Sequence, residues 1–277
     1  MGIISINNGY HATKVIQDNK RYSFESKIER MIDDYGTGVS INGIKYKVGV
    51  GNRDIDLDKS NNTVQLACIE YAVQQSYFED AKIITSLPVN LYSNKALKEE
   101  YTKRIFTLDN KIKDVRIYME GAAAQLADLN WYKGRLVALL DIGGLTINTM
   151  IFEDGKLVPG TQDSFNLGTI ILDNKIRTAL ASNDCNNYTD YQIPYLFNSS
   201  DNNIRMKVDE TVWGHLEEVR QTLKKKGYPT NIDYRFVGGG ALRLEQYLLN
   251  FFGGYISEEA LWENALGQYA LAKVVWK

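Results

Sequence analysis

A short pattern of apolar residues, a polar glycine turn and a second strand occurs twice in this chain. The first copy joins the apolar residues 3–6 to an Asn-x-Gly turn at residues 7–9. The second copy, halfway along the chain, joins residues 136–140 to an Asp-x-Gly-Gly turn at residues 141–144. A duplication at this scale predicts two related lobes that face each other across a cleft, each contributing one polar turn.

The composition is that of a globular protein with a core large enough to need no covalent staples. The chain has 277 residues, of which 44% are hydrophobic and 24% are charged. Its net charge of -2 gives no general attraction to nucleic acid, so we expect any association with DNA to be indirect. The isolated Cys68 and Cys185 argue against a zinc site or a disulfide framework. With only His11 and His215, a histidine-based triad is disfavoured.

Targeting signals are absent from the sequence pattern. We find no secretory signal peptide and no apolar run of membrane-spanning length, so we expect a cytoplasmic protein without a membrane partner.

Predicted strands alternate with predicted helices, which indicates an α/β fold. The strands are expected at residues 2–6, 12–17, 21–26, 44–50, 82–87, 115–119, 193–197 and 233–237, and in the repeated opening from residue 136. The helices are expected at residues 64–77, 95–105, 121–129, 169–181, 209–226, 241–251 and 258–275.

The first polar turn, NNGYHATK, has the residue types of a phosphate site. Successive backbone N–H groups in a tight glycine turn can surround an anion, and Lys14 adds a positive charge. The alternative is an ordinary hairpin, for which Asn-Gly is a common turn.

The second turn adds a carboxylate, Asp141, at the end of a buried strand. Such a carboxylate suits Mg²⁺, which keeps several of its waters and needs few protein ligands. A purely structural turn is the alternative.

Two further positions are candidates for the same site. Three consecutive glycines, 238–240, follow a strand and open a helix, where a backbone can approach a flat ligand closely. Glu120 follows the strand 115–119, where it either interacts with a helix dipole or orients a water molecule.

Seven segments of the chain together resemble the actin-like ATPase superfamily, and most closely its ParM (StbA) branch of plasmid-segregation filament proteins. The segments follow the family's order and cover most of the chain: NNGYHATK, IITSLPVNLY, YMEGAAA, LLDIGGLTINTMIF, SFNLGTIIL, FVGGGALRL and WENALGQYALAK.

The resemblance implies an actin-like fold with two duplicated lobes around a central nucleotide cleft. Lobe I would comprise residues 1–135 plus 258–277, and lobe II residues 136–257. About 90 residues separate Thr146 from Val237, so we expect the second lobe's outer subdomain to be reduced, with the Asn-rich stretch 182–203 in its place.

The function that the resemblance implies is a nucleotide triphosphatase that polymerises with ATP or GTP and Mg²⁺. Its partners would be further copies of itself and a DNA-binding adaptor protein of a plasmid partition system. The alternatives are a small-molecule kinase of the same superfamily and a nucleotide-binding module that does not polymerise.

Roles carry over from the family position by position. Gly9 and Lys14 would contact phosphate, Gly143, Gly144 and Thr146 would surround the phosphates, and Gly168 would approach the phosphate side. Gly238, Gly239 and Gly240 would pack against the base and ribose. Asp141 would hold magnesium-bound waters, and Glu120 would position the attacking water. For the base pocket, we suspect the helix that contains Glu217, Glu218 and Arg220.

The sequence departs from the family at the first turn, which normally begins with aspartate. Here that position is Asn7, and Asn8 replaces a second acidic residue. An amide oxygen can still bind a magnesium water but carries no negative charge. We therefore expect Asn7 to reach the metal through water, with weaker Mg²⁺ affinity or slower hydrolysis as the consequence.

Overall fold

The computed structural model describes residues 1–18, 20–32, 37–53, 58–184 and 188–277. Cys185, Asn19, and parts of the polar stretches 33–44, 51–62 and 182–203 lie outside the described residues.

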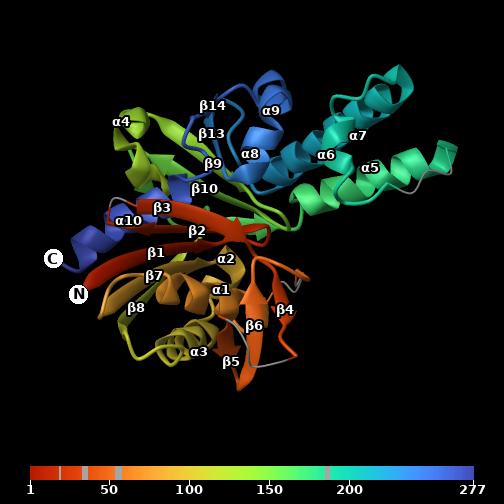
Figure 1. Ribbon diagram of the computed structural model, residues 1–277. Helices are drawn as coiled ribbons and strands as arrows, with labels where there is room; N and C mark the ends of the chain where they lie inside the picture. The colour runs from red at the N-terminus through yellow and green to blue at the C-terminus, as the bar shows by residue number, and fades with distance from the viewer. Residues whose placement is uncertain (19, 33–36, 54–57, 185–187) are drawn as a thin grey trace.

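Two sheets with the same construction form the centre of the molecule (Figure 1). The first sheet has the order β3-β2-β1-β7-β8, with bounds Lys20–Glu25, Ala12–Gln17, Gly2–Asn8, Ala81–Leu87 and Ile112–Met119. The second has the order β11-β10-β9-β13-β14, with bounds Lys156–Leu157, Ile147–Glu153, Leu136–Ile142, Asp233–Val237 and Tyr255–Ile256, and β12 (Asp163–Phe165) also pairs with β10. In both sheets the first three strands are antiparallel and the last two pair in parallel. The predicted duplication is confirmed.

The central strands are buried because helices cover the sheets. In β9, LVALLDI, only the first residue is exposed, which is typical of a strand covered on both faces. On the first sheet, α1 (Thr63–Gln74) buries Leu66 and Ile69, and its N-cap Asn62 accepts a hydrogen bond from the Gln65 N–H at 3.1 Å. The helices α2 (Val89–Tyr92) and α3 (Lys95–Phe106) follow β7.

A small third sheet lies beside α1. Its order is β4-β6-β5, with bounds Ile28–Arg30, Ile44–Val48 and Val39–Ile41. Val39 and Ile41 join the same core cluster as α1.

The second half carries a helical projection, which Figure 1 shows as α5, α6 and α7 extending away from the second sheet. Their bounds are Thr169–Asp184, Ile193–Leu196 and Asn202–Lys225. Leu172 and Ile176 of α5 share a buried cluster with Val212 and Leu216 of α7. Within the described ranges this projection contains no strand, in keeping with the reduced outer subdomain that we expected.

The closing helix returns to the first half, as predicted. Helix α10 (Glu263–Val275) packs against β1 and β2. The Ser5 hydroxyl of β1 donates a hydrogen bond to the Ala265 carbonyl at 2.9 Å. Gly267 lies so close to the Ala123 carbonyl that a side chain there would collide with it. This contact ties the end of the chain to the segment that follows Glu120.

Several predicted elements are wrong or misplaced. The predicted strand 193–197 is the short helix α6, because Pro194 at the start of a helix already has helical φ. The predicted helix 121–129 begins as a turn, because Gly121 has a φ of +79°. It continues as the 3₁₀ helix η1 (Ala124–Ala127) and then as α4 (Leu129–Tyr132).

Other boundaries moved for local reasons. Helix α7 begins at Asn202 rather than at residue 209, because Asp201 caps the Asn203 and Ile204 N–H groups. The predicted helix 241–251 is two helices, α8 (Gly239–Arg243) and α9 (Glu245–Phe252). The last helix begins at Glu263 rather than at residue 258.

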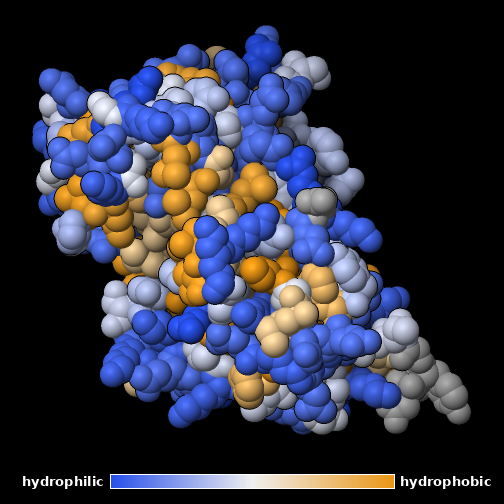
Figure 2. Space-filling view, turned by 90° about the vertical axis from the view of Figure 1, so that its left-hand side faces the viewer, coloured by the Kyte–Doolittle hydropathy of each residue, from blue (hydrophilic) through white to orange (hydrophobic). Residues whose placement is uncertain are grey.

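Figure 2 shows the face of the molecule on the side where Figure 1 places α4 and α10. Apolar surface gathers in the middle of this face, between polar regions. Leu129 of α4 and Val274 and Val275 of α10 are among the exposed apolar side chains of these elements. No helix in the described part of the chain is both long and apolar enough to cross a membrane.

Candidate functional site

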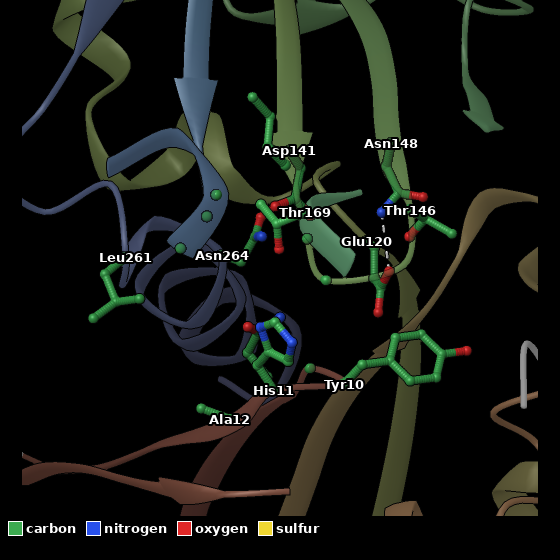
Figure 3. Close-up of a pocket in the computed structure, with 18 of the residues that line it drawn as sticks. Tyr10, His11, Ala12, Glu120, Asp141, Thr146, Asn148, Thr169, Leu261 and Asn264 are labelled. Atoms are coloured by element: carbon green, nitrogen blue, oxygen red, sulfur yellow. Dashed lines mark hydrogen bonds between the residues drawn. The ribbon is translucent and has the colours of Figure 1, made fainter. Parts of the chain in front are cut away.

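A cavity of about 190 Å³, with several charged and polar residues in its lining, lies between the two halves of the molecule (Figure 3). It is lined by the turn between β1 and β2, the turn between β9 and β10, the turn between β13 and α8, and the segment after β8. Eleven of the twelve predicted site residues line it: Asn7, Gly9, Lys14, Glu120, Asp141, Gly143, Gly144, Thr146, Gly238, Gly239 and Gly240.

The two hairpins that face the cavity have the same internal geometry. Strand pairing sets Asn7 opposite Lys14 in the first hairpin and Asp141 opposite Asn148 in the second. The Gly9 N–H donates to the Ala12 carbonyl at 3.2 Å, and the Gly143 N–H donates to the Thr146 carbonyl at 2.9 Å. A carboxylate, a lysine and two amides therefore meet where the hairpins converge.

Lys14 is a buried cation that forms no ion pair with a described residue. The residue is only 9% exposed, and no described residue accepts a hydrogen bond from its ammonium group. Burial lowers its pKa, and the nearby Asp141 opposes that shift only in part. An unpaired charge in a low-dielectric site is unfavourable, so an anion in the cavity would stabilise this lysine.

Asp141 is a carboxylate in the same desolvated surroundings. Burial, followed by the charge of Glu120, raises its pKa to about 6, while a hydrogen bond from Asn264 and the charges of Lys14 and Lys59 act in the other direction. A carboxylate with a raised pKa is one whose negative charge is incompletely compensated, and a cation at this point would compensate it.

The donor set fits Mg²⁺ better than a metal that needs several protein ligands. No group of three His, Cys, Asp or Glu side chains that could hold a metal occurs among the described residues. Mg²⁺ is commonly held by one or two carboxylates, waters and substrate phosphates. Asn148 lines the cavity, and its side-chain amide oxygen is buried and has no hydrogen-bond partner among the described residues. Asp141, with Asn148 and Asn7 beside it, can therefore supply hard oxygen ligands directly or through water.

Glu120 faces the cavity from the end of β8. Its N–H donates to the Leu87 carbonyl at 2.9 Å, which fixes the backbone, and the residue is 6% exposed. The carboxylate accepts a hydrogen bond from the Asn148 amide at 3.0 Å (Figure 3) and forms an ion pair with Lys59. The segment that follows is a turn and one short 3₁₀ helix, so the alternative of a helix-dipole partner has no helix to support it.

Packing explains two of the three consecutive glycines, and the third is open to the cavity. Gly238 has a φ of +91°, and a Cβ there would lie 2.8 Å from an Asp141 oxygen. A Cβ on Gly240 would collide with Ile142. A Cβ on Gly239 would meet only Leu261, at 3.6 Å. The exposed backbone at Gly239 is thus a surface that a flat ligand can cover.

Gly168 is the one predicted site residue that does not line the cavity. Its N–H donates to the Leu145 carbonyl at 3.0 Å, and a Cβ there would collide with the Gly144 carbonyl. It supports the second turn from behind. Asn8 is also outside the lining, because its amide donates to the Gln65 carbonyl at 2.8 Å and accepts from Thr13 at 2.7 Å.

The helix suspected for the base pocket does not reach the cavity. Glu218 of α7 pairs with Lys175, and Arg220 pairs with Glu217 and lies 5.1 Å from the Phe251 ring centre. None of the three suspected residues is in the lining.

Several lining residues were not singled out from the sequence: Tyr10, His11, Lys59, Asn148, Thr169, Arg243, Leu261 and Asn264. Asn148, Arg243 and Asn264 lie within segments that carried the resemblance, so their polar side chains were a usable signal. Lys59 lies in a polar loop whose residue types gave no signal of a functional site. Arg243 is held by Asp173 through two hydrogen bonds of 2.9 and 2.5 Å.

A buried ion pair anchors the residue next to Asn264. Arg235 of β13 is fully buried and donates to both carboxylate oxygens of Glu263, at 3.2 and 2.6 Å. Its guanidinium also lies 4.9 and 4.6 Å from the ring centres of Trp131 and Tyr255. These contacts join the second sheet to the first turn of α10 and so hold Asn264 near Asp141.

No protein-family model and no curated protein matches this sequence. Solved structures match over its whole length. Ta0583, an archaeal actin homologue, is 18% identical with a TM-score of 0.77, covering 99% of this chain and 100% of its own. The apo pSK41 ParM protein is 14% identical with a TM-score of 0.70, covering 99% and 98%. A 15-stranded ParM filament from Clostridium botulinum is 18% identical with a TM-score of 0.75, covering 99% of both chains. The chain has the actin-like fold, with its duplicated halves around a central cavity.

Proposed function

We propose that this protein is a ParM-like nucleotide triphosphatase that binds ATP or GTP with Mg²⁺ and assembles into filaments that segregate plasmid DNA. The observation that carries the proposal is that equivalent turns of two duplicated halves bring together Lys14, which has no ion pair among the described residues, and the desolvated Asp141. An unmatched cation and an unmatched anion in one cavity suit a ligand that carries both phosphate and a divalent metal.

Different residues of the cavity would contact different parts of the nucleotide. The glycine turns at Gly9 and Gly143–Gly144, with Lys14 and Thr146, would contact the phosphates. Asp141, with Asn7 acting through water, would hold the Mg²⁺. The open backbone at Gly239, flanked by Gly238 and Gly240, would cover the ribose and base, and Gly168 would keep the second turn in place.

Glu120 is the residue that we assign to the attacking water. Phosphoryl transfer is catalysed mainly by positioning and by stabilising charge, and a fixed carboxylate can hold a water in line with the terminal phosphate. The metal would supply neutralisation of the phosphate charges. The chain's own residues bind the phosphates, orient the water and exclude bulk solvent from the cleft.

Assembly follows from the fold by analogy. Among the matching structures are the botulinum ParM filament and an Alp12 filament, and Ta0583 and a Spiroplasma citri MreB5 have been solved with ADP and with AMPPNP. Identical subunits joined head to tail through two different surfaces form open filaments. The apolar surface on the α4 and α10 side offers one face for such a contact (Figure 2).

We further propose that lobe I comprises residues 1–135 plus 258–277 and that lobe II comprises residues 136–257. Closure of these lobes on a nucleotide would link binding to assembly. The adaptor that connects filament to plasmid, and the cytoplasmic location, belong to the same proposal.

One observation favours a second candidate, a nucleotide-binding module that neither polymerises nor hydrolyses. Asn7 stands opposite Lys14, where Asp141 stands opposite Asn148 in the other hairpin, so the cavity has one fewer carboxylate than two equivalent turns could supply.

Light scattering and phosphate release, recorded together after addition of Mg²⁺ with ATP or GTP, test the proposal. A dynamic filament gives scattering that rises and then falls as phosphate is released. Scattering without phosphate release indicates a static polymer that does not hydrolyse its nucleotide. No scattering and no phosphate with either nucleotide would contradict the proposed function.

A further inference from the structure

Lys59 holds the carboxylate that we assign to catalysis. It lies in the loop before α1 and is 3% exposed, and its ammonium group lines the cavity. That group forms an ion pair with Glu120, donates to the Asn8 carbonyl at 3.0 Å and lies 4.7 Å from the Tyr10 ring centre. The contacts come from two separate segments, the β1–β2 hairpin and the end of β8, so they define one position for the ammonium group.

The two lysines of the cavity differ in how their charge is balanced. Lys14 has no ion-pair partner among the described residues, whereas Lys59 is paired with Glu120. A diphosphate adds charge that Lys14 and the glycine turns can balance. A terminal phosphate adds further charge, and Lys59 is the remaining lysine of the lining that can balance it.

Both carboxylate oxygens of Glu120 have a partner in the arrangement that the structure shows. One carboxylate oxygen pairs with Lys59 and the other accepts a hydrogen bond from the Asn148 amide at 3.0 Å. A carboxylate that orients a water must offer an oxygen to a water O–H. The ion pair with Lys59 competes for that oxygen, so releasing Lys59 favours the hydrogen bond to water.

We propose that Lys59 is a positioning residue that senses the terminal phosphate of the nucleotide. Without that phosphate, Lys59 holds Glu120. With it, the ammonium group pairs with the phosphate, and the freed Glu120 oxygen accepts a hydrogen bond from the attacking water. This inference rests on the proposed function and adds to it a means by which the site distinguishes a triphosphate from a diphosphate.

The test compares the affinities of a non-hydrolysable triphosphate and a diphosphate, each with Mg²⁺, by isothermal titration calorimetry. Lys59→Met should weaken the triphosphate roughly ten- to a hundredfold, the effect of one charge-assisted hydrogen bond, and the diphosphate much less. Lys59→Arg keeps the charge and should retain most of the preference. Lys47→Met, at an exposed position of β6, is the matched control and should change neither affinity.

A second variant probes the competition itself. Glu120→Gln removes the charge that holds Lys59, so it should tighten triphosphate binding severalfold while hydrolysis is lost. The gain should vanish in the Lys59→Met/Glu120→Gln double variant, because the two residues act as a pair. A gain that persists in the double variant, or equal weakening of both nucleotides by Lys59→Met, would overturn the inference. If Lys59→Met does not fold, the Glu120→Gln variant is sufficient as a test. An unchanged triphosphate affinity in Glu120→Gln would then overturn the inference.

These results separate the inference from the proposed function. A wild-type protein that binds neither nucleotide contradicts the proposed function. A wild-type protein that binds and hydrolyses, with an unchanged preference in the Lys59 variants, contradicts the role of Lys59 alone.

Discussion

Replacing Lys14 with methionine should have opposite effects on folding stability and on nucleotide binding. The ammonium group is buried and has no described ion pair, so the folded protein without ligand carries an uncompensated charge. Methionine has a similar length and no charge. Leaving a buried polar group unpaired costs roughly 1–3 kcal/mol, and the substitution removes this cost. The substitution also removes the attraction between Lys14 and Asp141, which offsets part of the gain. We expect a net stabilisation of about 1 kcal/mol, which corresponds to a Tm increase of about 2–4 °C.

The pH dependence of folding stability also indicates that Lys14 destabilises the ligand-free protein. Burial lowers the pKa of Lys14 in the folded state, so folding disfavours the protonated form. The stability cost is fully present while the lysine is protonated in both states, and it disappears as the pH rises through the lowered pKa towards the ordinary one. The stabilising effect of Lys14→Met should therefore be largest at low pH and shrink as the pH rises through the lowered pKa.

Binding should change in the other direction. One charge-assisted contact to phosphate contributes about 1.5–3 kcal/mol, so the Kd for Mg-nucleotide should rise roughly ten- to a hundredfold. Thermal unfolding without ligand and calorimetric titration with ATP and GTP measure the two effects. Lys47→Met is the control, since it removes an exposed lysine of the same half. An unchanged Kd would refute the phosphate assignment, and a lower Tm would show that Lys14 has a stabilising partner.

Three further outcomes are expected. Because the pKa of Asp141 is raised to about 6, its contribution to the stability of the ligand-free protein should fall as the pH rises from about 4 to 6, and a pH series of denaturant unfolding should show this slope in wild type but not in Asp141→Asn. Asn7→Asp should tighten Mg²⁺ in the nucleotide complex and speed phosphate release, and an unchanged metal dependence would contradict the water-mediated role of Asn7. Arg235→Leu leaves Glu263 buried without its partner and should cost about 3–5 kcal/mol of unfolding free energy, whereas Arg21→Leu removes an exposed pair and should cost about 1 kcal/mol or less.

The repeated strand–turn–strand pattern predicted most of the architecture. Its apolar runs and glycine turns are local features, and they recur as β1–β2 and β9–β10 with matching registers. The alternation of strands and helices then sufficed for the class of fold. The return of the last helix to the first half came from the family resemblance and is confirmed.

Elements with weak local signals were less predictable. The apolar run at 193–197 fits a strand or a helix equally well by periodicity, and packing against α5 and α7 makes it a helix. The Ala-rich stretch after Glu120 has high helix propensity, but the φ of +79° at Gly121 and its close packing against Met150 start it as a turn.

The cavity's lining was predictable where a residue type and a turn coincide, as at Asp141 and Gly239. Lys59 could not be found in this way, because a lysine in a polar loop is ordinarily exposed. Its burial depends on Glu120, Asn8 and Tyr10, which the fold brings to it from distant parts of the chain. Pairings of this kind depend on tertiary structure and have no local pattern.

The central claim is that two equivalent turns from the duplicated halves bind one nucleotide triphosphate with Mg²⁺. The most direct test is a crystal structure of the protein with Mg²⁺ and a non-hydrolysable triphosphate. We predict phosphates between the turns at Gly9–Lys14 and Gly143–Thr146, with the metal beside Asp141. A nucleotide bound elsewhere, or phosphates held by one turn alone, would contradict the account.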